Sequence, residues 1–519
     1  MAGSRVRKSM KNTIFGLCGM IIYLAVSFFS KSIFISLLGN EYNGVNYLFT
    51  GILNALNLAE LGFGGAIAYA LYKPLSIQDH EQIAALMNFY KKVYRIIALV
   101  VLFLGSLCIP FLQYVIKEDI NNLPFSLGQL RIYYIIFLLN TVFSYLLAYK
   151  RTIINADQCS YITTSVDYSA NIILTIVQVV FLYLTKNYYV FLLTMLAKTI
   201  INNIIIQIIA NKKYPYLLQL KNEKLLKKDT REILKNVKAM MFHKIGSVII
   251  INTSTVVVSA LVGLQETSLY GNYIMIATQV TSFINIFFTA LTASIGNLCA
   301  EESVDKQIDL YNKLNYVSLW LGYFTFICYV CLYNPFMEIW LGQNMIFNIE
   351  TVIMIAFYQS IQYLRKSTIS FRDAKGLFIY DQYKPLVEAA IGISLALILG
   401  KYYGVFGIML GYSISTLFIA IPIEIFVLIK KGFNGSFMKY LLQIFFILII
   451  TSIVTYVTYI IVNLLNNGIG YFILKLTICL IIPNSLFILC TFWTKEFKYY
   501  KNLIKSMFKK LKFKNKKYL

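Results

Sequence analysis

Charged residues are scarce in this sequence of 519 residues. Lys, Arg, Asp and Glu make up 13% of it, whereas a soluble domain has about 25%. Hydrophobic residues make up 58%, and the mean hydropathy is +0.67. A chain this apolar is not a soluble multidomain enzyme. It has room for about fourteen membrane-spanning helices of roughly 20 residues each, which predicts an all-α polytopic membrane protein.

Histidines and paired cysteines are too few for metal chemistry. The chain has two histidines, and its eight cysteines are scattered, mostly within apolar runs. Cys328 and Cys331 form a Cys-x-x-Cys pair in the apolar stretch FICYVCLY, but neither a second pair nor a nearby histidine completes a metal site. The sequence also lacks a nucleophile elbow, a P-loop and a Rossmann glycine pattern. We therefore predict no metal site, no cofactor, no catalytic residues and no enzyme activity.

Apolar runs long enough to cross a membrane recur along the chain. The first follows MAGSRVRKSMKN; it is too long for the apolar part of a signal peptide and is not followed by a small-residue cleavage site. We interpret it as the first spanning helix. In total the pattern predicts fourteen spans, at residues 12–38, 45–72, 93–116, 130–149, 161–184, 188–210, 241–262, 269–298, 313–334, 348–369, 385–400, 404–429, 440–464 and 469–493.

Positive charge alternates along these runs. Lys and Arg number 47 against 23 Asp and Glu, a formal net charge of +24. Nearly all of the Lys and Arg lie at the two ends of the chain or in loops after even-numbered runs. Cytoplasmic loops carry such an excess, so we predict a multi-pass protein of the plasma membrane with both termini cytoplasmic. Because membrane topology explains the charge, we expect no nucleic-acid partner.

The two halves of the chain share a pattern. The segment YKKVYRI from Tyr90 is matched by YNKLNYV from Tyr311, and the pair Lys212-Lys213 is matched by a lysine pair 218 residues later. If this is an internal repeat, each unit has six helices and the units are related by an axis along the membrane normal. The alternative is that Tyr and Lys simply favour membrane interfaces.

The runs also predict a domain organisation. We expect an N-lobe at 1–210, a basic cytoplasmic linker at 211–240, a C-lobe at 241–431, two further helices at 432–494 and a basic tail at 495–519. In the linker and the tail, apolar residues recur at helical spacing among lysines. Both are predicted to be amphipathic helices lying on the anionic lipids of the cytoplasmic leaflet. Recruitment of an anionic lipid or a partner enzyme is the functional alternative.

Ionisable residues inside the apolar runs give the strongest functional signal, because a charge at membrane depth is costly. Glu60 lies near the middle of the second run, just before Gly62 and Gly64, where glycine weakens the helix. A carboxylate beside an adaptable backbone suits an ion-coupling site or a gating hinge. The alternative is a carboxyl group that burial keeps neutral or that hydrogen-bonds between helices.

Two lysines are predicted to line a substrate cavity. Lys198 lies about ten residues, roughly 15 Å, from either end of the sixth run, which is too deep for easy snorkelling. Lys31 lies about seven residues from the outer end of the first run. If the second and sixth helices face one cavity, Lys198 and Glu60 could pair. Arg131 and His243 could extend the cationic lining, although their interfacial positions explain them equally well.

Three further acidic residues lie in the inner thirds of predicted helices: Asp167, Glu388 and Glu424. Carboxyl groups inside a membrane often belong to proton or ion relays. We therefore treat these three as candidates for coupling to H+ or Na+.

Three segments carry a family resemblance. They are LAELGFGGAIAYALYKPLSIQDHEQIAALMNFYKKVYR (58–95), DAKGLFIYDQYKPLVEAAIG (373–392) and YYGVFGIMLGYSIST (402–416). They resemble, in order and spacing, the bacterial oligosaccharide-repeat-unit flippases of the multidrug/oligosaccharidyl-lipid/polysaccharide (MOP) exporter superfamily. The resemblance covers essentially the whole chain and is closest to the polysaccharide branch of low-GC Gram-positive bacteria.

The resemblance implies a twelve-helix core in two lobes around a central cavity, followed by two extra C-terminal helices. It also implies alternating access that moves undecaprenyl-pyrophosphate-linked oligosaccharide repeat units from the inner to the outer leaflet, for capsular polysaccharide or exopolysaccharide assembly. Flippases of this kind are expected to line the cavity with cations that meet the pyrophosphate, and many couple to an ion gradient. A polysaccharide polymerase and glycosyltransferases are the implied protein partners.

Three alternatives stay open. A lipid II or spore-cortex flippase of the same superfamily fits almost as well. A multidrug or cation antiporter shares the superfamily fold but typically has twelve helices and an anionic cavity, whereas this chain has fourteen predicted spans and two deep lysines. A membrane polysaccharide polymerase usually has a large outer loop or an acidic catalytic motif, and this sequence shows neither.

Overall fold

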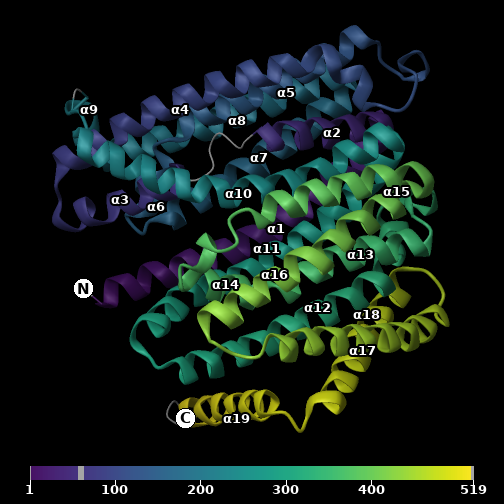
Figure 1. The fold of residues 1–519 in the computed structure, drawn as a ribbon. Helices are drawn as coiled ribbons and strands as arrows, with labels where there is room; N and C mark the ends of the chain where they lie inside the picture. Colours follow the sequence, from purple (N-terminus) through teal and green to yellow (C-terminus); the bar gives the residue numbers. More distant parts are fainter. Residues whose placement is uncertain (1, 57–62, 222, 516–519) are drawn as a thin grey trace. The chain divides into compact units, whose positions relative to one another are not determined.

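A computed structural model describes residues 2–515 of the chain apart from 57–62 and 222, with some helical side chains, such as those of 238–247, outside the description. The described elements are all helices, with no strand among them (Figure 1). The chain forms two compact units, unit 1 up to Gly271 and unit 2 from Asn272 onward. The predicted all-α class is confirmed. The predicted domain boundaries stay predictions.

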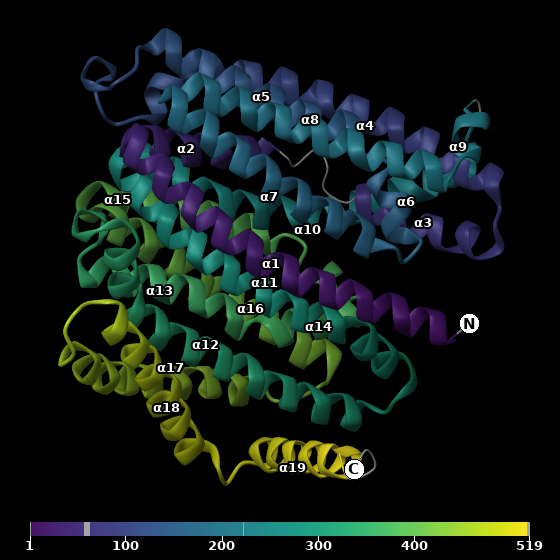
Figure 2. The ribbon, with the colours of Figure 1, turned by 180° about the vertical axis from the view of Figure 1, so that it is seen from behind.

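The described part of unit 1 consists of ten α-helices, two 3-10 helices and the start of α11. The longer helices are α1 (Ala2–Leu38), α2 (Asn40–Leu56), α3 (Phe63–Ile77), α4 (His80–Cys108), α5 (Leu127–Ala148), α7 (Ser160–Thr185), α8 (Tyr188–Lys213) and α10 (Lys227–Leu261). The short ones are η2 (Ile109–Val115), η3 (Ile120–Asn122), α6 (Arg151–Ala156) and α9 (Tyr216–Gln219). In both views α5 runs beside α4 and α8, against which it packs (Figure 1, Figure 2).

Unit 2 contains the remaining elements. They are most of α11 (Leu264–Glu301), α12 (Val304–Leu341), η4 (Gln343–Met345), α13 (Ile349–Leu364), α14 (Lys366–Ala374), η5 (Leu377–Ile379), α15 (Lys384–Ser415), η6 (Thr416–Ala420), α16 (Ile421–Phe426), η7 (Val427–Gly432), α17 (Phe437–Asn463), α18 (Ile469–Thr491) and α19 (Lys495–Asn515). Helix α12 packs against α13, α17 and α18.

Helix ends in unit 1 follow local sequence signals. Helix α5 begins with a capping box: Ser126 Oγ accepts from the backbone N–H of Gln129 at 3.3 Å, and the Gln129 side chain accepts from the backbone N–H of Ser126 at 2.8 Å. Asp79 caps α4 in the same way as an N-cap acceptor. Helix α1 ends at Leu38, before Gly39, whose φ of +94° favours glycine.

Helix α15 is two helices folded against each other at Gly404. This glycine has φ +58° and ψ −139°, which lies outside the helical region. Gly411 lies so close to the backbone of Ala396 that a Cβ would not fit, and Gly407 lies equally close to Leu399. Small residues allow this close helix–helix approach. The two predicted spans 385–400 and 404–429 therefore form an antiparallel hairpin.

Nine segments of the described chain are long and apolar enough to cross a membrane. One of them, Lys384–Gly432, holds both of the spans just described. The four other predicted spans also coincide with helices: 45–72 with α2 and α3, 241–262 with α10, 269–298 with α11, and 348–369 with α13 and α14. The chain is a multi-pass membrane protein.

Buried tyrosines form hydrogen bonds in the interior of each unit. In unit 1, Tyr90 is fully buried, and its hydroxyl donates to the hydroxyl of Tyr94 at 2.8 Å. In unit 2, the hydroxyl of Tyr323 donates to the backbone carbonyl of Pro483 at 2.7 Å, and Tyr311 exchanges a hydrogen bond of 3.0 Å with Thr368. A buried tyrosine packs its ring and still needs a partner for its hydroxyl. The Tyr90 bond lies within α4, whereas the two bonds of unit 2 join α12 to α18 and to α14.

Candidate functional site

A polar cavity lies among five helices of unit 1. Its volume is about 360 Å³. We call it the Lys198 cavity; its lining comes from α4, α5, α6, α7 and α8 and consists of Tyr94, Ser144, Tyr145, Ala148, Arg151, Asn171, Lys198, Thr199, Asn202 and Asn203. The lining contains two cations, three amides and two tyrosines, and Lys198 lies deep in a predicted span. A charge at membrane depth is costly and usually marks a functional site.

Lys198 is held in this cavity by one hydrogen bond. Its Nζ donates to Thr175 Oγ1 on α7 at 2.8 Å. Among the described residues no carboxylate oxygen lies within 4 Å of this Nζ. A lysine ammonium has three donors, so two of them are available to a ligand in the cavity.

Arg151 is the second cation of the Lys198 cavity, and it is paired. Its Nη1 forms a short ion pair with Asp167 Oδ2, while Asn202 Nδ2 donates to Asp167 Oδ1 at 2.9 Å. The Asn202 Oδ1 is buried and has no hydrogen-bond partner in the structure. Because Arg151 neutralises Asp167, the charge of Lys198 gives the described lining of the cavity one net positive charge. Such an environment favours an anionic ligand that also has hydroxyl groups.

The structure places Lys31 in a different polar cluster, between α1 and α2. Its Nζ donates to Asn43 Oδ1 at 2.8 Å and lies 4.6 Å from the centre of the Tyr47 ring. Asn43 in turn donates to Ser268 Oγ at 2.8 Å. Lys31 does not line the Lys198 cavity, so the two deep lysines predicted for one lining are separate.

The other predicted lining residues are only partly described. Arg131 is exposed on α5 and does not line the Lys198 cavity. Glu60 and Gly62 lie outside the described residues, as does the side chain of His243, whose backbone is in α10. Gly64 lies in the first turn of α3, where a Cβ would meet the hydroxyl of Tyr90 at 3.4 Å. The proposed pairing of Glu60 with Lys198 stays a prediction.

Unit 2 brings Glu388 and Glu424 together in a buried ionic cluster. Glu424 is 1% exposed and Glu388 is 4% exposed. Arg365 donates to Glu424 through a two-bond fork, from Nε at 2.9 Å and from Nη2 at 2.6 Å. Its Nη1 donates to Glu388 Oε1 at 3.2 Å. The two predicted coupling residues therefore share one guanidinium.

Three further side chains balance the charge of this cluster. Lys384 forms a short ion pair with Glu424, and its Nζ lies 3.5 Å from Glu388 Oε2. Arg372 Nη1 donates to Asp381 Oδ2 at 2.6 Å. Three buried cations thus face three buried carboxylates, and Arg372 also donates to the exposed Asp373, so each of these carboxylates already has a cationic partner. The arrangement favours a structural role for Glu388 and Glu424, and their part in ion coupling stays a prediction.

The two units use similar pairs at similar places. In unit 1, Arg151 follows α5 and pairs with Asp167 inside α7. In unit 2, Arg365 follows α13 and pairs with Glu388 inside α15. The arginines are 214 residues apart and the acids 221, offsets close to the 218 residues of the lysine pairs. This correspondence is compatible with the predicted repeat, in which one copy keeps an open cavity and the other a closed ionic cluster.

The partners of the three acidic residues were not predicted from the sequence. Arg151, Arg365 and Lys384 were interpreted as cytoplasmic loop charges, since each lies at the end of an apolar run. The available signal was their spacing: Arg151 and Arg365 each lie about twenty residues before an acid inside the next run. An arginine at one helix end can reach an acid in a neighbouring helix.

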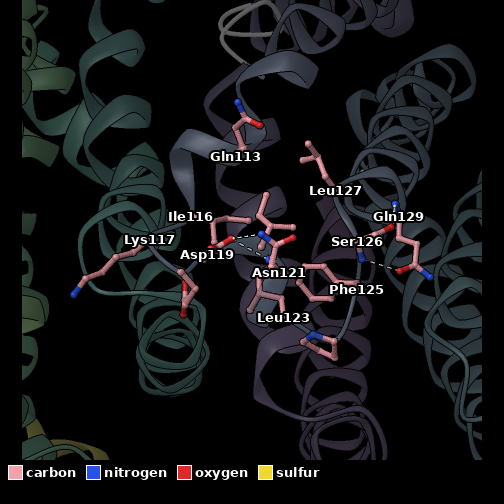
Figure 3. Close-up of a pocket in the computed structure, with 13 residues that line it drawn as sticks. Gln113, Ile116, Lys117, Asp119, Asn121, Leu123, Phe125, Ser126, Leu127 and Gln129 are labelled. Carbon is pink, nitrogen blue, oxygen red and sulfur yellow. Dashed lines mark hydrogen bonds between the residues drawn. The ribbon is translucent and has the colours of Figure 1, made fainter.

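A larger pocket lies in the connection between α4 and α5. Its volume is about 850 Å³, and its lining includes Lys117, Asp119, Asn121, Ser126 and Gln129 (Figure 3). Several of these side chains already serve local turns: Asp119 accepts from the backbone and side chain of Asn121, and Ser126 and Gln129 cap α5 (Figure 3). The pocket contains none of the predicted site residues, so we favour the Lys198 cavity.

Comparison with known proteins identifies solved structures of similar fold. No protein-family model matches the sequence, and no curated protein matches it. Among solved structures, the lipid II flippase MurJ in an inward closed conformation matches with a TM-score of 0.65 at 15% identity, over 95% of this chain and 99% of that chain. An inward-facing multidrug resistance MATE transporter of the MOP superfamily matches with a TM-score of 0.60 at 14% identity, over 79% and 97%. The chain has the fold of MOP-superfamily transporters.

A third solved structure of similar fold is a MOP-superfamily transporter whose binding pocket is described as unusual. A MOP-superfamily transporter from Pyrococcus furiosus Vc1 matches with a TM-score of 0.55 at 12% identity, over 83% of this chain and 97% of that chain. Its structure is described as having a binding pocket of reverse polarity that suggests a different function. These similarities show the fold alone, and the function of this chain has to be argued from its site.

Proposed function

We propose that this protein is a flippase for undecaprenyl-pyrophosphate-linked oligosaccharide repeat units. In this proposal it moves them from the inner to the outer leaflet of the plasma membrane by alternating access, for capsular polysaccharide or exopolysaccharide assembly. The observation that carries the proposal is the Lys198 cavity, which combines amide and hydroxyl groups with a lysine that has no carboxylate partner in the described part of the chain. The match to a lipid II flippase over nearly the whole of both chains supports a lipid-linked substrate.

The electrostatics of the cavity suit a pyrophosphate. A pyrophosphate carries about two negative charges, and each unpaired charge inside a membrane costs several kcal/mol. The ammonium of Lys198, with two donors available, would lower that cost through charge-assisted hydrogen bonds. The polyprenyl chain is apolar and can stay in lipid while the headgroup crosses.

Orientation and energy coupling complete the proposal. Both ends of the chain are cytoplasmic, as the lysine-rich loops indicate. Coupling to H+ or Na+ would act through Glu60, because the carboxylates of Asp167, Glu388 and Glu424 are already paired with Arg151 and Arg365. The basic tail of α19 would contact anionic lipid, and a polymerase and glycosyltransferases would supply and use the cargo.

The alternatives fit the site less well. A cation antiporter needs an anionic cavity, whereas the Lys198 cavity has a net positive charge. A polymerase would need catalytic acids at the membrane surface, whereas Glu388 and Glu424 are buried in ion pairs. A lipid II flippase would use the same cation for the same pyrophosphate, so only the glycan distinguishes it from our proposal.

The decisive experiment is deletion of the gene in the native host, followed by mass spectrometry of extracted polyprenyl-linked glycans. We expect an oligosaccharide repeat unit to accumulate while the surface polysaccharide is lost. Accumulation of lipid II instead would assign the protein to peptidoglycan synthesis. New sensitivity to cationic drugs without any accumulated lipid-linked sugar would contradict the flippase proposal.

A further inference from the structure

A second cavity of unit 1 has different chemistry from the Lys198 cavity. Its volume is about 660 Å³, and it lies where the C-terminal half of α3, the start of α4 and the start of α10 meet. The polar and aromatic part of its lining consists of Tyr69, Tyr72, Lys73, Asp79, Gln82 and Asp229. We call it the Tyr69 cavity. It shares no lining residue with the Lys198 cavity, and its volume is typical of small-molecule sites.

Two tyrosines present open ring surfaces to this cavity. Tyr69 is 73% exposed and Tyr72 is 54% exposed, and their ring centres are 6.3 Å apart with an angle of 77° between the planes. The tyrosines of the interior, such as Tyr90, are fully buried. An exposed tyrosine offers an apolar ring face together with a hydroxyl group, so it suits a ligand that is itself both apolar and hydroxylated.

Polar groups fixed by the helix ends face the same space. Asp79 Oδ1 accepts from the backbone N–H of Gln82 at 3.0 Å as the cap of α4, and Gln82 Nε2 donates to Asp229 Oδ2 on α10 at 3.3 Å. Among the described residues, the second oxygen of each of these carboxylates has no hydrogen-bond partner, so both can accept from ligand hydroxyls. The helix cap and the link between α4 and α10 hold these acceptors in place before a ligand arrives.

The charge of the described lining of the Tyr69 cavity disfavours both a phosphate and a simple cation. Among the described lining residues, Lys73 contributes one positive charge and Asp79 and Asp229 contribute two negative ones, so their net charge is negative. A pyrophosphate would be repelled, in contrast to the Lys198 cavity. Lys73 would repel an organic cation from the same lining, and both carboxylates are partly engaged. Aromatic faces with carboxylate, amide and ammonium groups match a neutral polyol best.

We propose that the Tyr69 cavity binds sugar units of the glycan while the Lys198 cavity meets the pyrophosphate. This inference rests on the proposed function and names a separate subsite for the saccharide. Helix α4 carries lining residues of both cavities, Gln82 for one and Tyr94 for the other, twelve positions apart. At 1.5 Å per residue this is about 18 Å, a span that a short oligosaccharide attached to a pyrophosphate can cover.

The test uses the full-length protein and native mass spectrometry, which resolves each bound lipid by its mass. Two probes are compared: undecaprenyl pyrophosphate without sugar, and the undecaprenyl-pyrophosphate-linked glycans extracted from membranes of the native host. The variants are Tyr69→Ala and Gln82→Ala, and the matched control is Tyr183→Ala, a tyrosine that is 65% exposed on α7 and lines neither cavity. Because Tyr69 is exposed, its truncation should leave folding intact.

We expect both cavity variants to lose the glycan-linked lipid at least five-fold relative to wild type, while their binding of the sugar-free pyrophosphate stays unchanged. The control should match wild type for both probes. Equal losses of both probes, or no loss of either, would overturn the sugar subsite while leaving the flippase proposal standing. If the wild-type protein bound neither probe, the proposed function itself would fail. Binding of tetraphenylphosphonium that depends on Tyr69 would instead assign the cavity to organic cations.

Discussion

Among single residues, Lys198 is the strongest candidate for a functional role. Its depth in the sequence predicted a functional cation, and the structure places its ammonium in a polar cavity with one hydroxyl partner. The sequence placed Lys198 deeper than Lys31 but predicted both to line the cavity, whereas in the structure Lys31 hydrogen-bonds to Asn43 elsewhere in unit 1. The difference comes from packing, because the side chains that open or close a cavity lie on several helices far apart in the sequence.

We predict that Lys198→Ala reduces export of lipid-linked glycan by roughly ten- to a hundred-fold, because it removes about 1.5–3 kcal/mol of charge-assisted hydrogen bonding to the pyrophosphate. The measurement is surface polysaccharide in a deletion strain that produces the variant at normal protein level. Lys212→Ala is the matched control, since Lys212 is exposed at the end of the same helix. Normal surface polysaccharide in the Lys198 variant would remove this residue from the site.

Glu424 differs from Lys198, because its charge is already paired with Arg365 and Lys384 inside the protein. We predict that Glu424→Gln lowers the free energy of unfolding by about 3–5 kcal/mol, because it leaves Arg365 and Lys384 buried with too few counter-charges. Adding Lys384→Met should recover part of this loss. Thermal unfolding in detergent measures both, with the exposed Glu350→Gln as control. Wild-type stability of Glu424→Gln would show that the carboxylate is not a structural ion-pair partner.

Among the elements, the α15 hairpin shows how much local sequence decides. A gap of three residues in the apolar pattern, 401–403, predicted two spans, and the backbone turns at Gly404, directly after that gap. The close approach of the two arms was not predictable, because it depends on Gly407 and Gly411 facing the other arm.

We predict that Gly404→Ala destabilises unit 2 by about 1–3 kcal/mol, since a side chain does not tolerate its backbone conformation. The measurement is the unfolding temperature of the purified variant. Gly470→Ala serves as control, because this glycine lies in α18 with open space around its Cα, and alanine there should be neutral or slightly stabilising. Equal behaviour of the two variants would argue against a strained turn at Gly404.

At the scale of the whole molecule, topology follows from charge. The alternation of lysine-rich and lysine-poor loops predicts that α19 lies in the cytoplasm. We therefore expect a green fluorescent protein fused after the last residue to fluoresce and an alkaline phosphatase fused there to be inactive. The control places the same reporters in the connection around Asn122, predicted to be outside, where the results should reverse. An active phosphatase at the C-terminus would contradict the predicted topology.

The sequence by itself determined that this is an all-α, multi-pass membrane protein, because apolar runs, loop charge and helix caps are local properties of the chain. It also singled out Lys198 and the buried acids, since a charge in an apolar run is visible without a structure. Only the tertiary structure decided which of these charges are paired. Arg151 reaches Asp167 and Arg365 reaches Glu388 and Glu424 across helix contacts that no local pattern encodes. Those contacts leave Lys198 beside a cavity with no carboxylate partner among the described residues, because electrostatic pairing depends on distances in space.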